Sequence, residues 1–136
     1  MKRNLRVGIM GLLATSAILS GCSTFGLRDF SEITRQNNSR IMTLQRGMTP
    51  EQVVEHIGPS GNSRIPNPFR SEGYPAGDDT FRAFFFYTGM GYVADLEGIV
   101  DSDLMPVVFK NERLDGWGRS YWKSTVMQYN IRIGNR

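Results

Sequence analysis

The chain has 136 residues, a formal net charge of +3, one cysteine and one histidine. This length suits one small domain with a single hydrophobic core. A lone cysteine excludes an internal disulfide, and together with a lone histidine it leaves no Cys/His cluster that would hold zinc.

The first residues have the pattern of an export signal. Residues 1–6 carry three positive charges and no acid, and residues 7–19 are uncharged and mostly apolar. A basic start followed by a short apolar run and small residues is typical of such signals. The run is shorter than the roughly 20 apolar residues that span a bilayer. We therefore predict a lipoprotein signal peptide over residues 1–21.

The apolar run ends in LSGC, which places Cys22 directly behind small residues. This segment resembles the lipobox of bacterial lipoproteins. The resemblance implies cleavage between Gly21 and Cys22, a diacylglycerol on the Cys22 sulfur and acylation of the new amino terminus, for example by palmitate. Two or three chains anchor a protein firmly in a membrane. Serine rather than aspartate at position 23 implies the periplasmic side of the outer membrane rather than the inner membrane. A buried apolar cysteine or a redox thiol is the alternative interpretation of Cys22.

Removing the signal also removes the excess of positive charge. The chain has 16 Lys and Arg against 13 Asp and Glu, and three basic residues lie in the signal, so residues 22–136 are formally neutral. The basic surface of a nucleic-acid-binding protein is therefore absent, and we expect no nucleic-acid partner. Residues 71–103 are acidic and residues 104–136 are basic. These parts either face each other or form two surface patches.

Residues 22–30 are expected to form a lipidated tether, and residues 31–136 a small α+β periplasmic domain. The first predicted helix covers residues 31–46, with Ser31 as N-cap and with Ile33, Ile41 and Leu44 roughly on one face.

The strongest local signal is GMTPEQVVEHIGPS, which predicts a short helix of about two turns. Thr49 is placed as N-cap, Pro50 occupies the first helical position and Gln52 follows three residues after the cap. This is a capping box with a proline start. Gly58 and the proline after it end the helix.

Residues 59–80 are rich in Pro, Gly, Ser and Asn and predict a long loop, with Phe69 as a plug. Residues 81–88 predict a strand, and its consecutive aromatic residues indicate burial on both faces and hence a central position. An acidic loop is expected over residues 95–103. Residues 105–110 and 113–117 predict a hairpin.

Asn111 is placed at the turn of that hairpin, and a helix near residues 120–129 is favoured over a further strand. The predicted fold class is therefore α+β. It has two N-terminal helices packed on a small antiparallel sheet of about three strands, with a short C-terminal helix.

Two resemblances follow from these segments. GMTPEQVVEHIGPS is similar to the start of the SmpA/OmlA-like outer-membrane lipoprotein domain, which includes the small accessory lipoprotein of the β-barrel assembly machine. That likeness implies two N-terminal helices on a three-stranded antiparallel sheet. NPFRSE, the aromatic strand ending in YT, the acidic loop and PVVFKNERLDGWGRSYWKST look like an uncharacterised family of proteobacterial envelope lipoproteins, a domain of unknown function. This second likeness spans roughly residues 40–133. It implies a lipoprotein location and brings no catalytic residues.

Candidate catalytic and metal-binding groups are few. His56 lies near the end of a capped helix, where a cationic side chain interacts favourably with the partial negative charge of the last carbonyl groups. Four acidic residues offer the hard oxygen ligands that calcium takes. Aligned as an EF-hand on Gly98, however, the stretch lacks oxygen ligands at the first and last positions, so a solvated loop is favoured. The four residues are Asp95, Glu97, Asp101 and Asp103.

Three aromatic residues near the C-terminus, Trp117, Tyr121 and Trp122, form a candidate contact patch, with packing in the core as the alternative. We expect no cofactor and no enzymatic activity. The leading hypothesis is an outer-membrane-anchored lipoprotein, attached through Cys22, that contacts another envelope protein in envelope assembly or maintenance. The alternative is a ligand- or cation-binding module that uses the 59–80 loop and the acidic 95–103 stretch. A hydrolase is the third and weakest hypothesis, because no G-x-S-x-G elbow is present.

Overall fold

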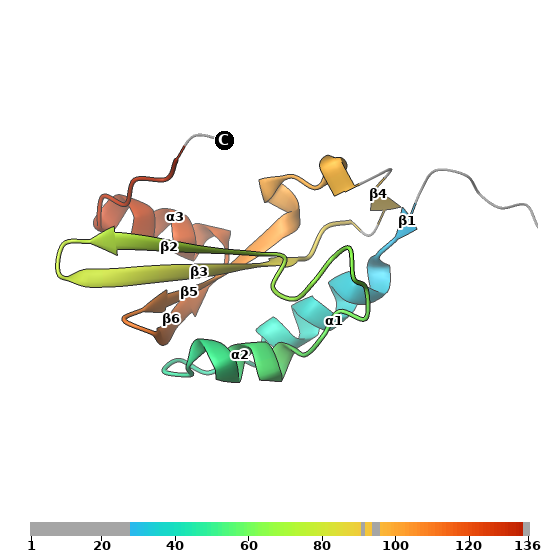
Figure 1. Ribbon diagram of the computed structural model, residues 1–136, viewed down its shortest axis with the longest axis horizontal. Coiled ribbons are helices and arrows are strands. Elements are labelled where there is room, and N and C mark those ends of the chain that lie inside the picture. The colour runs from blue at the N-terminus through green and yellow to red at the C-terminus, as the bar shows by residue number, and fades with distance from the viewer. Residues whose placement is uncertain (1–27, 91, 94–95, 135–136) are drawn as a thin grey trace, which may run out of the picture.

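The computed structural model describes residues 28–90, 92–93 and 96–134, and it has the α+β architecture that the sequence predicts (Figure 1). Two helices come first, a four-stranded antiparallel sheet follows, and a third helix comes last. The helices are α1 (Ser31–Ile41), α2 (Pro50–Ile57) and α3 (Arg119–Gln128). The strands, in their spatial order, are β2 (Arg70–Ala76), β3 (Asp79–Tyr87), β5 (Leu104–Lys110) and β6 (Arg113–Trp117).

Smaller elements lie at the end of the sheet where α1 begins (Figure 1). A two-stranded antiparallel ribbon pairs β1 (Arg28–Asp29) with β4 (Tyr92–Val93). Two short 3₁₀ helices, η1 (Leu96–Gly98) and η2 (Asp101–Asp103), lead into β5. Within the described ranges, no helix has the length and apolar character needed to cross a membrane.

The prediction of about three strands was wrong, because β2 lies inside the segment 59–80 that the sequence predicts as a loop. β2 pairs with β3 in continuous antiparallel register from Arg70 opposite Phe85 to Ala76 opposite Asp79. It is an edge strand, and its side chains alternate between half-buried and exposed. Glycine and proline, which weaken a central strand, are tolerated at such an edge. Pairing with β3, rather than local propensity, makes this segment a strand.

The cap of α2 is confirmed. The Thr49 hydroxyl oxygen accepts a hydrogen bond from the Gln52 N–H at 3.3 Å, and the Gln52 side-chain oxygen accepts one from the Thr49 N–H at 2.9 Å. Gly58 has a φ of 71°, which ends the helix. Val53 and Ile57 are fully buried on the side of α2 that faces the sheet.

The first helix ends earlier than predicted and has a different cap. It stops at Ile41, and Phe30 rather than Ser31 occupies the N-cap position, without a side-chain hydrogen bond. The Thr43 hydroxyl donates to the Arg40 carbonyl oxygen at 2.9 Å as the chain leaves the helix. Leaving the helix here lets Leu44 enter the core beside Ile41. Tertiary burial therefore overrides the helical periodicity at this point.

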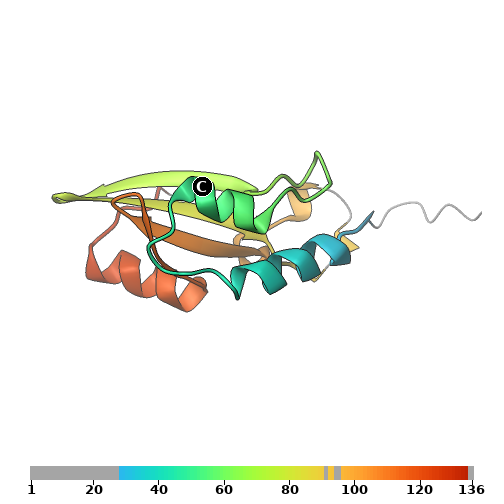
Figure 2. The same ribbon diagram turned by 90° about the horizontal axis from the view of Figure 1, so that it is seen from below.

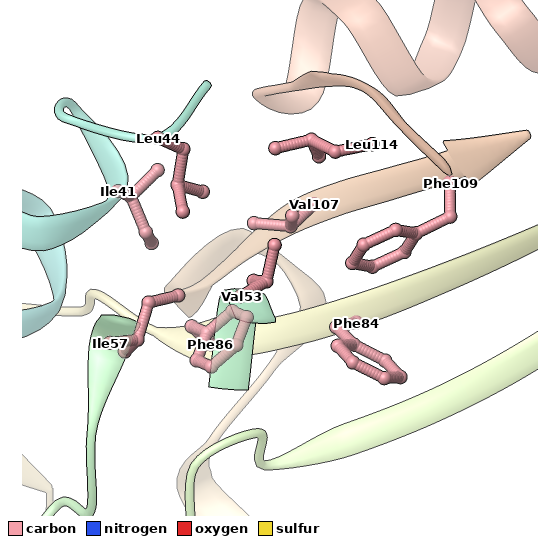
Figure 3. Close-up of a cluster of buried hydrophobic side chains, with 9 residues drawn as sticks. All are labelled: Ile41, Leu44, Val53, Ile57, Phe84, Phe86, Val107, Phe109 and Leu114. Atoms are coloured by element: carbon pink, nitrogen blue, oxygen red, sulfur yellow. The ribbon is translucent and has the colours of Figure 1, made fainter. Parts of the chain in front are cut away.

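Helices cover both faces of the sheet. Alternate side chains of β3 point to opposite faces, as predicted, and those from Phe84 to Tyr87 are buried. On one face, α2 and the end of α1 pack on the sheet, and side chains from the helices and the strands form a cluster of nine buried residues (Figure 3). Figure 2 views the molecule from this side. On the other face, α3 packs over Phe81 and Val108.

Residues 105–110 and 113–117 form the predicted hairpin. Asn111 and Glu112 make its turn with φ values of 50° and 60°, the left-handed conformation that a type I′ turn has at both central positions. The register shifts between Val108 and Phe109, so Asp115 is the extra residue of a β-bulge opposite them. The C-terminal segment then forms α3, as favoured, rather than a further strand.

Candidate functional site

A groove of about 380 Å³ lies between β2 and α3, on the face of the sheet that α3 covers in part. Its floor includes Phe85, Leu104 and Pro106, and its wall on the side of α3 includes Trp122 and Val126. Five charged side chains surround this apolar interior: Arg70, Glu72, Asp101, Arg119 and Lys123. An apolar cleft with a few convergent polar groups is the usual form of a binding site.

Arg70 is the central charged group of the groove. Its Nε lies 2.7 Å from Oε1 of Glu72, and its Nη1 lies 2.9 Å from Oδ1 of Asp101. Its guanidinium carbon lies 4.3 Å from the centre of the Phe85 ring, which is a cation–π contact. β2 positions Arg70, Glu72 and Tyr74 on one face because alternate residues of a strand share a face. The Tyr74 hydroxyl in turn donates to Glu72.

Two arginines hold η2 from opposite sides of the groove. Arg70 reaches it from β2 through the Asp101 carboxylate. Arg119 reaches it from α3 by donating to the Ser102 carbonyl oxygen. The Asp101 side chain is 83% exposed, so water screens its ion pair with Arg70, and such pairs contribute about 0 to 1 kcal/mol. An incoming anion therefore competes for Arg70 at low cost.

The three residues of the predicted contact patch do not lie on one surface. Trp117 packs against the cluster on the α2 side of the sheet, whereas Tyr121 and Trp122 belong to α3 and pack against the opposite face. Of the three, only Trp122 lines the groove, and all are half-buried. The structure therefore divides the predicted patch and brings one member to the candidate site.

Tyr121 has a packing role that involves the GWG segment. Its hydroxyl donates to the Asp115 carboxylate. A Cβ at Gly116 would lie 2.5 to 2.6 Å from three atoms of the Tyr121 ring, so the absence of a side chain at Gly116 makes room for the phenol. The pKa of Tyr121 is raised to about 12. Burial is the larger cause, and the hydrogen bond to Asp115 is the next largest.

Of the described acidic residues in the 95–103 stretch, Asp101 lines the groove, whereas Glu97 and Asp103 do not. Asp101 pairs with Arg70, and the Asp103 carboxylate accepts a hydrogen bond from the Val100 N–H at 3.0 Å. Glu97 is exposed. No group of three or more His, Cys, Asp or Glu in the described part of the chain is arranged to hold a metal ion. Asp95 lies outside the described residues.

His56 lies in the last turn of α2, as the sequence predicts. Its Nε2 is 2.8 Å from the Thr43 hydroxyl oxygen, and its backbone carbonyl accepts from Arg40 Nη1 at 3.0 Å. These contacts join α2 to the end of α1. Residues 1–27, which contain Gly21, Cys22 and Ser23, lie outside the described residues, so the lipidation and cleavage sites stay predictions.

Comparison with protein-family models, with curated proteins and with solved structures finds no significant match for this chain. The two family resemblances therefore stay predictions, and the site rests on its own geometry.

Sequence reasoning missed Arg70, Arg119 and Lys123 as site residues. Arg119 and Lys123 share a face of α3, whereas the predicted helix began near residue 120 and left Arg119 outside it. Arg70 gave no such signal, because its segment read as a loop.

Proposed function

We propose that this chain is an outer-membrane-anchored, non-catalytic periplasmic lipoprotein that acts through contacts with another envelope protein, in envelope assembly or maintenance. The groove between β2 and α3 is the contact surface. The observation that supports this most strongly is the groove itself, an open apolar cleft of about 380 Å³ with charged side chains at its rim. The anchor rests on the lipobox-like segment that ends at Cys22.

Anchoring is tested by replacing the thiol. Cys22→Ala should abolish labelling by a fatty-acid probe and leave an unprocessed precursor, because only the thiol forms the thioether. Cys22→Ser is a closer isostere and should fail in the same way. Labelling that persists in both variants contradicts the anchor.

The contact is tested in cells with a photo-crosslinking amino acid at position 123, on the groove rim. A matched control places the same amino acid at Arg35, whose side chain is 74% exposed on α1. We expect a specific adduct with an envelope protein from position 123 only, identified by mass spectrometry, and less of it in Cys22→Ala cells. No adduct, or equal adducts from both positions, contradicts the proposed contact.

A second candidate is a ligand-binding module, favoured by one observation. The 59–80 segment supplies Arg70 and the 95–103 stretch supplies Asp101, and these residues form an ion pair beside the groove. The cation-binding form is the weaker version, because the arginine already neutralises Asp101. Calorimetry with calcium tests it, and an absence of heat together with an unchanged melting temperature rules out calcium.

A further inference from the structure

The groove exists because α3 covers only part of its face of the sheet. α3 packs over β5 and β6, whereas the side chains of Arg70, Glu72 and Tyr74 on β2 line the open part. The volume of about 380 Å³ is at the small end of the range of about 300 to 1,000 Å³ that ligand pockets cover. The groove therefore suits a narrow occupant with one or two apolar side chains.

The charges of the groove are not balanced. Both carboxylates are engaged, since Glu72 and Asp101 each pair with Arg70. Arg119 and Lys123, on the opposite wall, form no ion pair with a carboxylate in the described residues. They stand four residues apart on α3, so they lie along one face of the helix. One rim of the groove therefore carries two cations that favour a carboxylate on the occupant.

The N-terminus of α3 adds to this preference. Its N-cap is Gly118, which provides no side-chain hydrogen bond to the first turn. The first backbone N–H groups of a helix carry partial positive charge, and this end favours anions. Arg119 begins the helix at the same place. The Arg119 side chain, the uncapped first turn of α3 and Lys123 therefore all favour an anion at this rim.

The free edge of β2 indicates that the occupant is a peptide. β2 is the outermost strand of its sheet, so in the described structure its outer backbone edge has no strand beside it. An extended peptide satisfies such an edge with main-chain hydrogen bonds, and its alternate side chains face one side. A single-chain lipid satisfies the apolar cavity but offers no backbone to this edge.

We propose that the groove binds an acidic peptide segment of a partner protein, with one apolar side chain inserted between Phe85, Leu104 and Trp122, and with flanking carboxylates on Arg119 and Lys123. This inference rests on the proposed function, because it names the chemistry of the protein that the groove contacts. Arg70 offers a further cation to the occupant, since its ion pair with the exposed Asp101 is readily exchanged.

The test uses the full chain in detergent and two blocked eight-residue peptides. One has a central leucine flanked by aspartates, and the other has asparagines in their place. Binding is followed by fluorescence anisotropy of a dye on the peptide. The acidic peptide should bind at least tenfold more tightly than the neutral one, and its affinity should fall as salt is added.

Lys123→Glu should lower the affinity for the acidic peptide at least tenfold, because it reverses a charge at the rim and leaves the core unchanged. Arg64→Glu reverses an exposed charge that does not line the groove and should change the affinity less than twofold. Unchanged melting temperatures verify that both variants are folded. Equal affinity for the two peptides, or an unaffected Lys123→Glu variant, overturns the proposal.

A third probe, the fatty acid dodecanoate, tests whether the carboxylate that the groove binds belongs to a lipid rather than to a peptide. If dodecanoate binds in a Lys123-dependent manner and neither peptide binds, the peptide proposal is overturned. If the crosslink at position 123 captures an envelope protein while the acidic peptide fails, the ligand chemistry is wrong and the proposed function stands. If both fail, the proposed function fails as well.

Discussion

Replacing Gly116 with alanine is expected to destabilise the domain through a clash with one side chain. The new Cβ would lie 2.5 Å from Cζ and 2.6 Å from both Cε atoms of the Tyr121 ring. Carbon atoms attract each other best at about 3.5 to 4.0 Å, so the ring has to move by about 1 Å. The ring is restrained, because its hydroxyl donates to Asp115 and the Arg46 guanidinium carbon lies 5.9 Å from its centre.

Two opposing effects set the size of the change in the free energy of unfolding. Overpacking a well-ordered site costs about 1 to 3 kcal/mol. The loss of glycine's freedom in the unfolded chain offsets about 0.4 to 1 kcal/mol of this, because Gly116 has no left-handed φ that alanine would strain. The net decrease in the free energy of unfolding should be about 1 to 2 kcal/mol.

The assay is a double-mutant cycle measured by urea unfolding. In a Tyr121→Ala background the ring is absent, so alanine at position 116 should be neutral or stabilising. A coupling free energy of about 1 kcal/mol or more between the two positions is then expected. Equal effects of Gly116→Ala in both backgrounds would refute the reasoning, and so would a loss below about 0.5 kcal/mol in the parent chain.

Three further predictions concern caps, buried amides and pH. Thr49→Ala should lower the free energy of unfolding by about 1 kcal/mol in urea, because the Gln52 N–H loses its acceptor; a change within error contradicts the cap's contribution. Asn37→Ala should lower it by about 2 to 3 kcal/mol, measured by thermal unfolding, because a fully buried amide donates at 2.8 Å to the Tyr87 carbonyl oxygen. The third prediction concerns pH. Folding raises the pKa of Tyr121 from about 10 to about 12, so the neutral phenol stabilises the folded state fully at pH values below about 10. This stabilisation is lost as pH rises towards 12. Unfolding at pH 9 and 11 should therefore show a steeper loss in the parent than in Tyr121→Phe, and parallel losses would contradict this.

Much of the fold could be predicted where the signal is local. The capping box of α2 depends on residues within four positions of one another, so the sequence contains all of its partners. The alternation of buried side chains in β3 and the Asn111 turn are likewise determined over a few residues. The helix after the hairpin was favoured over a further strand, and the structure has it as α3.

Asn37 illustrates what local patterns do not reveal. In the sequence it is one polar residue within the helix predicted over residues 31–46. In the structure it is fully buried, and it exchanges hydrogen bonds with Asn67, 30 residues away, at 2.8 and 3.1 Å. Its partner Asn67 also donates to the Gly58 carbonyl oxygen. The pair therefore joins α1 to the segment after α2, which no helical pattern predicts.

The sequence by itself determined the α+β class, the position of α2, the hairpin after β5 and the formal neutrality of residues 22–136, because each depends on neighbouring residues or on composition. Only the tertiary structure decided that residues 70–76 form an edge strand, since that strand depends on pairing with β3. It also placed Trp117 and Trp122 on opposite faces of the sheet. It brought β2, η2 and α3 together to form the groove. A binding site made from segments far apart in the chain is a property of their packing, and no single segment contains it.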